Sequence, residues 1–169
     1  MKNLLKIKRN LLLVSMLFLL TACPYTSMVP IDGKEIYDSN LIGKWRLCED
    51  GEILKGALEN YYIIEKHNAN GYNISSYSWV EAEKKIIKTD SYIGFITNVK
   101  DHQFLNVYVE DVGYCFFKIE KKDKNNLIFH QVTDEIELVF DTSKELKSYL
   151  EKNANYDMIY NKKLHLRKE

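Results

Sequence analysis

The sequence lacks the short motifs that mark most enzymes and metal proteins. It contains no G-x-S-x-G motif, no phosphate-binding P-loop and no H-x-H or H-E-x-x-H pattern. The histidines are far apart in the sequence, whereas zinc ligands usually come in closely spaced pairs. They are His67, His102, His130 and His165. No stretch groups a nucleophile with a general base. We therefore expect neither an enzyme nor a protein that binds a metal or a cofactor.

Beyond its first 22 residues the chain also lacks an excess of positive charge. The whole chain has 24 basic and 24 acidic side chains. Four of the basic ones, Lys2, Lys6, Lys8 and Arg9, lie in residues 1–22, where there is no acid. The remainder is therefore mildly acidic. Because nucleic-acid affinity comes largely from neutralising phosphates, we expect no nucleic-acid partner.

The N-terminal segment lacks an apolar run long enough to cross a membrane. Leu11–Leu20 spans ten residues, whereas a helix needs about 20 to cross a bilayer. A basic start, a short apolar run and the small residues Thr21 and Ala22 are typical of a secretory signal peptide. The segment LTAC, which ends at Cys23, resembles the lipobox of bacterial lipoproteins. This resemblance implies a signal peptide over residues 1–22 and a lipid on the Cys23 sulfur.

A lipidated Cys23 implies an anchored envelope protein. Stable anchoring needs more than one acyl chain, because each buried methylene contributes only about 0.8 kcal/mol. The lipids of such lipoproteins meet that requirement. Pro24 follows Cys23, where lipoproteins retained at the inner membrane of Gram-negative cells often have Asp. In such a host the sequence therefore favours the outer membrane. The alternative is an ordinary signal peptide cut nearby, which leaves Cys23 as a free thiol.

The rest of the chain divides into a tether and one domain. Residues 24–40 contain both prolines and show no regular apolar period, which predicts a tether of about 20–25 Å after Cys23. Residues 41–169 are enough for one domain. Strand patterns recur there about every ten residues between polar turns, which predicts an antiparallel barrel or sandwich of about eight or nine strands. The patterns cover residues 41–48, 60–67, 71–80, 85–99, 103–110, 113–120, 126–133 and 136–140.

One helix is predicted near the C-terminus, over residues 140–153. Thr142 and Glu145 have the spacing of a capping box, which would begin this helix. Leu146, Tyr149 and Leu150 are spaced to form one apolar face. After this helix the strand pattern returns, and a last strand is predicted over residues 157–169.

The opening of this domain resembles that of lipocalins and related calycin barrels. In those families a Gly-x-Trp begins the first strand, and here it is Gly43-Lys44-Trp45. Gly43 would let the backbone approach the barrel floor, and Trp45 would plug the closed end. The resemblance implies a lipocalin-like barrel with the late helix against its outside. It also implies an arginine stacked on the tryptophan, for which Arg167 is the candidate if the last strand closes the barrel beside the first.

Aromatic side chains are abundant on the predicted strands. They are Tyr61, Tyr62, Tyr72, Tyr77, Trp79, Tyr92, Phe95, Phe104, Tyr108, Tyr114, Phe116 and Phe117. They could form a packed core with cross-strand pairs, or line a cavity or a partner surface. We expect an envelope lipoprotein that binds a small apolar or amphiphilic ligand in its barrel. The alternative is a structural lipoprotein, or one that binds another envelope protein, with a solid barrel core.

Two cysteines lie within the predicted domain, where export allows disulfides to form. Strand alternation places Cys48 outward with Lys44 and Arg46, and Cys115 inward with Phe117. This parity argues against a simple pair, although a β-bulge could reverse either residue. The sequence therefore leaves open a Cys48–Cys115 disulfide or two separate thiols.

Overall fold

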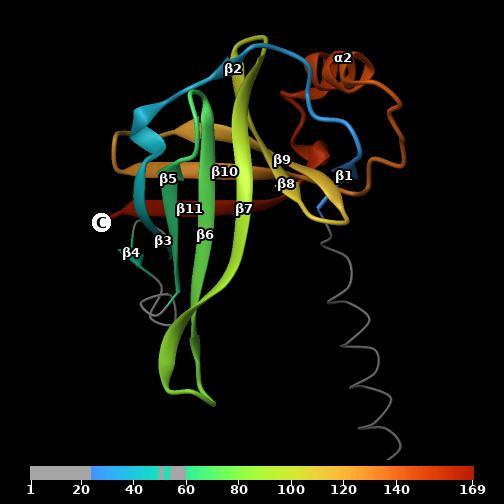
Figure 1. The fold of residues 1–169 in the computed structure, drawn as a ribbon. Helices are drawn as coiled ribbons and strands as arrows, with labels where there is room; N and C mark the ends of the chain where they lie inside the picture. The colour runs from blue at the N-terminus through green and yellow to red at the C-terminus, as the bar shows by residue number, and fades with distance from the viewer. Residues whose placement is uncertain (1–23, 50–51, 54–59) are drawn as a thin grey trace, which may run out of the picture.

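The computed structural model describes residues 24–49, 52–53 and 60–169. The predicted signal peptide and the lipidation site Cys23 lie outside these residues. Eight antiparallel strands form a closed barrel in the order β9-β10-β11-β3-β5-β6-β7-β8, and β8 pairs with β9 to complete the ring (Figure 1). The predicted mainly β, antiparallel barrel is therefore confirmed, with one helix before the last strand.

The barrel strands follow one another mostly through short hairpins. They are β3 (Gly43–Glu49), β5 (Tyr61–Lys66), β6 (Gly71–Val80), β7 (Lys85–Val99), β8 (His102–Val109), β9 (Gly113–Lys121), β10 (Asn126–Val132) and β11 (Tyr160–Lys168). The short strands β1 (Thr26–Ser27) and β2 (Glu35–Ile36) pair with β9 and β7, and β4 (Glu52–Ile53) pairs with β3. The helices are α2 (Ser143–Asn153) and the 3-10 turns η1 (Ser39–Leu41) and η3 (Asp157–Ile159).

Side chains alternate between the interior and the outer face of the barrel, as the pleat of a strand requires. On β8, Leu105 and Val107 face the interior, whereas Phe104 packs in a second core on the outer face. The register continues this parity on the next strand, because Val107 pairs with Cys115 and Leu105 with Phe117. The barrel wall therefore separates two apolar clusters.

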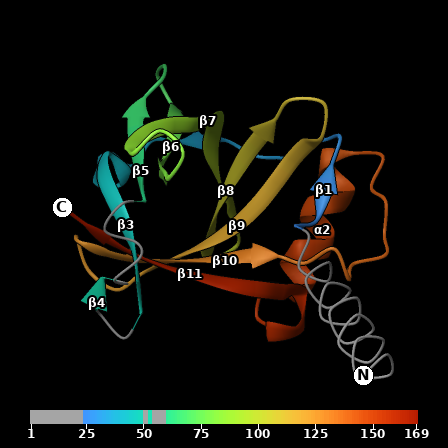
Figure 2. The ribbon, with the colours of Figure 1, turned by 90° about the horizontal axis from the view of Figure 1, so that it is seen from below.

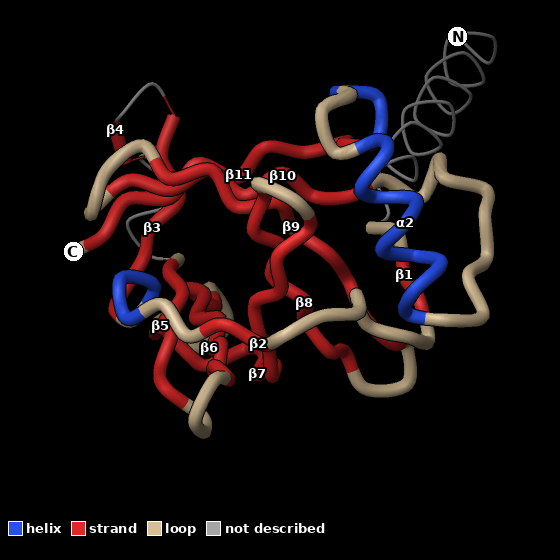
Figure 3. The backbone as a smooth tube through the Cα atoms, turned by 90° about the horizontal axis from the view of Figure 1, so that it is seen from above, coloured by secondary structure: helices blue, strands red, loops and turns tan. Residues whose placement is uncertain are grey.

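Helix α2 covers the outside of the barrel (Figures 2 and 3). The outer cluster of buried apolar side chains includes residues of this helix. Leu146 and Leu150 of α2 are buried against Phe104 of β8 and Phe116 of β9. The predicted capping box is present: Thr142 Oγ1 accepts from the Glu145 backbone N–H, and Glu145 Oε2 accepts from the Thr142 backbone N–H, both at 3.2 Å. Local cap chemistry and an apolar face thus place α2 where the lipocalin resemblance implies.

Residues 24–40 do not form the tether that the sequence predicts. β1 and β2 pair with the barrel, and Tyr25 and Ile31 are buried in the outer cluster. The backbone N–H of Ile31 donates to the buried Asn106 Oδ1 at 2.9 Å. The segment shows no regular apolar period because it contacts the barrel through separate sites of only one or two residues each. It folds as part of the domain.

The predicted strand over residues 136–140 is also absent from the described structure. This segment pairs with no strand, and it leads from β10 into α2. Both edges of β10 are already occupied by β9 and β11. A segment with a strand pattern needs a neighbouring strand whose backbone hydrogen-bonding groups are unpaired. The adjacent strand β10 has no unpaired edge.

Candidate functional site

The barrel encloses a cavity of about 500 Å³. This volume lies within the range of small-molecule sites, which are typically 300–1,000 Å³. The wall is mostly aliphatic and aromatic. Its apolar residues are Pro24, Leu47, Tyr62, Ile64, Ile74, Tyr92, Leu105, Val107, Val109, Cys115, Phe117, Phe129, Leu164 and Leu166. The inward faces of all eight barrel strands contribute.

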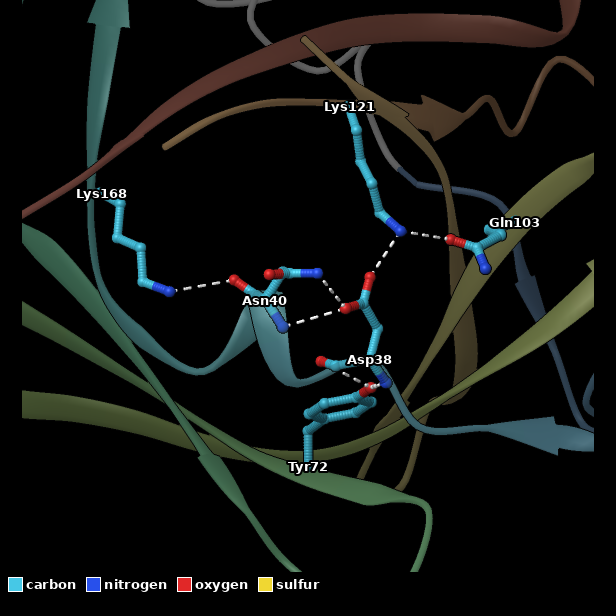
Figure 4. Close-up of polar contacts among 6 residues, drawn as sticks. All are labelled: Asp38, Asn40, Tyr72, Gln103, Lys121 and Lys168. Carbon is cyan, nitrogen blue, oxygen red and sulfur yellow. Dashed lines mark hydrogen bonds and ion pairs between the residues drawn. The ribbon is translucent and has the colours of Figure 1, made fainter. Parts of the chain in front are cut away.

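One end of the barrel is closed by large side chains and by η1. Trp45 and Tyr72 are fully buried there, beside Leu41 of η1. Trp45 Nε1 donates to the Leu41 carbonyl at 2.8 Å. The Tyr72 hydroxyl accepts from the Asp38 backbone N–H at 2.6 Å and donates to the Asp38 carbonyl at 3.3 Å (Figure 4). These bonds hold η1 over the end of the barrel and separate the lumen from solvent.

Asp38 also ties the closed end to the opposite wall. Its Oδ1 caps η1 by accepting from the Asn40 backbone N–H at 2.9 Å, and its Oδ2 lies 2.5 Å from Lys121 Nζ (Figure 4). Lys121 Nζ also donates to Gln103 Oε1 at 2.9 Å. Burial alone would raise the pKa of Asp38. The hydrogen bonds from Lys121 and Asn40 outweigh burial, so the pKa lies below its ordinary value.

Gly43 and Trp45 lie beside the end of the last strand. Gly43 has φ +143°, and a Cβ there would come within 2.5 Å of Lys168 Cε. This close approach and positive φ explain why glycine occupies the position. Trp45 pairs with Lys168, whose Nζ lies 5.4 Å from the tryptophan ring centroid.

Arg167 therefore does not take the position that the lipocalin resemblance implies for it. It pairs with Arg46 on the last strand, one residue before Lys168. Because successive side chains on a strand point to opposite faces, Arg167 points away from the face that carries Trp45 and its partner Lys168. The basic residue at the barrel floor is Lys168.

The other end of the lumen carries the polar side chains. Ser76 pairs with Asp90, and the register then shifts so that Tyr77 pairs with Lys88, which leaves Thr89 as the extra residue of a β-bulge. The bulge brings both Thr89 and Asp90 to the lumen. The Ser76 hydroxyl lies 2.7 Å from Thr89 Oγ1 and 3.2 Å from Asp90 Oδ2.

The polar end carries charges of both signs. Lys162 on β11 lines the same end, as do Ser78 and Gln131. β7 and β11 are on opposite sides of the eight-strand ring, so Asp90 and Lys162 lie across the lumen from each other. The lumen thus combines a long apolar wall with a polar, charged end.

Two tyrosine hydroxyls belong to this lumen. The pKa values of Tyr62 and Tyr92 are raised, mainly by burial and to a smaller extent by the nearby negative charge of Asp90. Both hydroxyls therefore keep their protons at neutral pH and can donate hydrogen bonds. They add polar atoms to the mostly apolar part of the wall.

Cys48 and Cys115 do not form the disulfide that the sequence left open; both are free thiols. Cys115 is buried and lines the lumen on β9. Cys48 lies on β3 in a separate surface hollow, with Asp123 and Arg167. The barrel wall stands between the two sulfurs, as strand parity indicates. Burial raises the pKa of both thiols, and Arg167 partly opposes this at Cys48.

The predicted aromatic set is divided among several places. Tyr62, Tyr92 and Phe117 line the lumen, and Tyr72 closes it. Phe104 and Phe116 belong to the outer core, and Tyr61 stacks on Tyr77 at 4.8 Å. The abundance of aromatic residues does not reveal the aliphatic half of the wall. The alternation of apolar residues on β8 and β11 could have revealed it.

No three His, Cys, Asp or Glu side chains within the described ranges are grouped closely enough to hold a metal ion. The buried His130 pairs with Glu120, with 2.8 Å between Nε2 and Oε2. Burial lowers the pKa of His130, although Glu120 opposes this.

Among the described residues, no helix is long and apolar enough to span a membrane.

Comparison with known protein families, curated proteins and solved structures finds no match. The function must therefore be argued from the geometry of the lumen.

Proposed function

We propose that the protein is a lipid-anchored envelope lipoprotein that binds a small amphiphile in its barrel. The observation that carries the proposal is the hollow, apolar lumen of about 500 Å³, closed at one end by Trp45 and Tyr72. Burying apolar surface contributes about 25 cal/mol per Å², so such a wall favours an aliphatic or aromatic body. The polar end with Asp90 and Lys162 suits a polar head group.

The proposed location in the cell envelope is inferred from the sequence. The lipobox resemblance at Cys23 supports an acyl anchor in the cell envelope, and Pro24 favours the outer membrane in a Gram-negative host. The alternative of a purely structural or protein-binding lipoprotein assumed a solid barrel. A hollow lumen gives that alternative less support, because side chains could have filled a barrel of this size.

Ligand binding is tested by fluorescence with the mature protein. N-phenyl-1-naphthylamine becomes bright in apolar sites, and dodecanol should displace it from the lumen. Val107→Trp places a large ring in the cavity and should weaken binding of the probe about tenfold or more. Tyr108→Trp is the matched control, because Tyr108 is the next residue on β8 and is exposed.

Equal probe binding by the two variants would place the site outside the lumen and contradict the proposal. Mass spectrometry of small molecules that co-purify with the native protein would then identify the class of ligand. An absence of probe binding by the wild-type protein would also contradict it.

A further inference from the structure

Pro24 lies at the junction of two hollows. It lines the polar end of the lumen, and it also lines a surface groove formed by residues 24–29 and the segment from Asp134 to Asp141. Its position is fixed by a β-bridge to Thr133, and the next residue, Tyr25, donates its backbone N–H to the Val132 carbonyl at 2.9 Å. The residue that follows Cys23 is thus held at the open end of the barrel.

Strand β9 runs from this open end of the barrel to the closed end. Its first residues pair with β1, where Cys115 is opposite Thr26. At its far end, Lys121 forms the ion pair with Asp38 beneath η1. Pro24, the residue that follows the predicted lipidation site in the sequence, therefore lies beside the opening of the lumen.

Exposed apolar side chains surround the groove next to Pro24. Met28 is 82% exposed, Leu138 50% and Val139 89%. Val112, in the adjacent β8–β9 hairpin, is also exposed, and the neighbouring Gly113 packs against the backbone of Ser27 and Met28. Clustered apolar side chains at a surface commonly mark a membrane or protein contact. We call Met28, Val112, Leu138 and Val139 the apolar rim.

We infer that the apolar rim docks the open end of the barrel onto the bilayer that holds Cys23, so that the lumen takes the acyl chain of a zwitterionic lipid from that bilayer. This inference rests on the proposed function and names the source of its ligand. Pro24, the opening of the lumen and the apolar rim all lie at one end of the barrel. A lipid could then move between membrane and lumen with little of its chain crossing water.

The charges in the groove select the kind of lipid surface. Its lining includes Asp134, Glu137 and Asp141 and contains no lysine or arginine. A leaflet rich in anionic lipids attracts basic segments and would repel these carboxylates. Zwitterionic head groups carry an ammonium group that can pair with them. We therefore expect docking on phosphatidylcholine and weaker docking when phosphatidylglycerol is added.

The inference is tested with the lipidated mature protein in phosphatidylcholine vesicles. In a Cys48→Ser/Cys115→Ala background, Val139→Cys places an environment-sensitive fluorophore on the apolar rim. Ala69→Cys is the matched control, because Ala69 is exposed in the β5–β6 turn at the closed end. Nitroxide-labelled lipids should quench the Val139 label by about twofold or more and leave the Ala69 label nearly unchanged. Met28→Asp should reduce the quenching at Val139, as should phosphatidylglycerol.

Equal quenching of the two labels, or stronger quenching at Ala69, would overturn the inference. So would a Val139 label that responds to an envelope-protein extract but not to lipid, since the rim would then bind a protein. Displacement of N-phenyl-1-naphthylamine by dodecanol in solution tests the proposed function separately. A barrel that binds the probe but shows no oriented docking contradicts only the inference.

Discussion

Lys168 lies over the ring of Trp45 and fixes the closed end of the barrel from the last strand. Its Nζ is 5.4 Å from the ring centroid and donates to the Asn40 carbonyl at 3.1 Å. The same lysine lies beside Gly43, whose φ of +143° favours glycine. One side chain thus joins the C-terminal strand, the first barrel strand and η1.

We expect Lys168→Met to destabilise the protein by about 1 kcal/mol. Methionine keeps an apolar stem of similar length but removes the cation–π contact and the hydrogen bond to Asn40, each of which contributes about 0.5–1 kcal/mol. Urea denaturation followed by tryptophan fluorescence measures the change. Lys88→Met, at an exposed position of β7, is the control. An equal effect of the two substitutions would show that Lys168 has no special role at the floor.

Asp38 should make the stability of the barrel depend on pH in the acid range. The pKa of Asp38 is lower in the folded protein than its ordinary value of 3.8, so the folded state favours the carboxylate. The resulting stabilisation is complete above the unfolded pKa and is lost as pH falls through the folded pKa. We therefore expect Asp38→Asn to be less stable than wild type at pH 7 and closer to it near pH 3.

Urea midpoints measured at several pH values between about 7 and 3 test this dependence. Other carboxylates with lowered pKa, among them Glu120 at about 2, will destabilise both proteins together. The difference between the two curves therefore isolates Asp38. Parallel curves would show that the ion pair with Lys121 adds no pH dependence.

The two domain thiols should react at different rates. Cys48 is half-buried, whereas Cys115 is buried in the lumen, so we expect a maleimide to modify Cys48 first. Dodecanol should slow the reaction of Cys115 without changing that of Cys48, because only Cys115 faces the proposed ligand. Peptide mass spectrometry over time measures both rates. Protection of Cys48 instead would indicate a ligand at the outer surface.

The helix cap can be tested independently of the lumen. Thr142→Ala removes the hydroxyl that accepts from the Glu145 N–H, and we expect a loss of about 1 kcal/mol. Thr142→Ser should retain most of the stability. Ser148→Ala, at an exposed position within α2, is the control. A loss at Thr142 no greater than that at Ser148 would mean that packing of Leu146 and Leu150 alone fixes the helix.

The sequence by itself determined the elements whose signals are local. Alternating side chains specify the eight barrel strands and separate Cys48 from Cys115, because pleat geometry acts residue by residue. The capping box at Thr142 begins α2 for the same reason. The lipobox at Cys23 remains a prediction from sequence, because it lies outside the described residues.

Only the tertiary structure decided which segments meet and how much space remains between them. Residues 24–40 were predicted as a tether, yet Tyr25 and Ile31 pack on the outer wall through contacts that leave no period in the sequence. The register between β3 and β11 places Lys168, rather than Arg167, over Trp45. The lumen is hollow because strand number and register set the width of a closed barrel. That width, compared with the side chains that point inward, is a property of the whole ring that no single stretch of sequence contains.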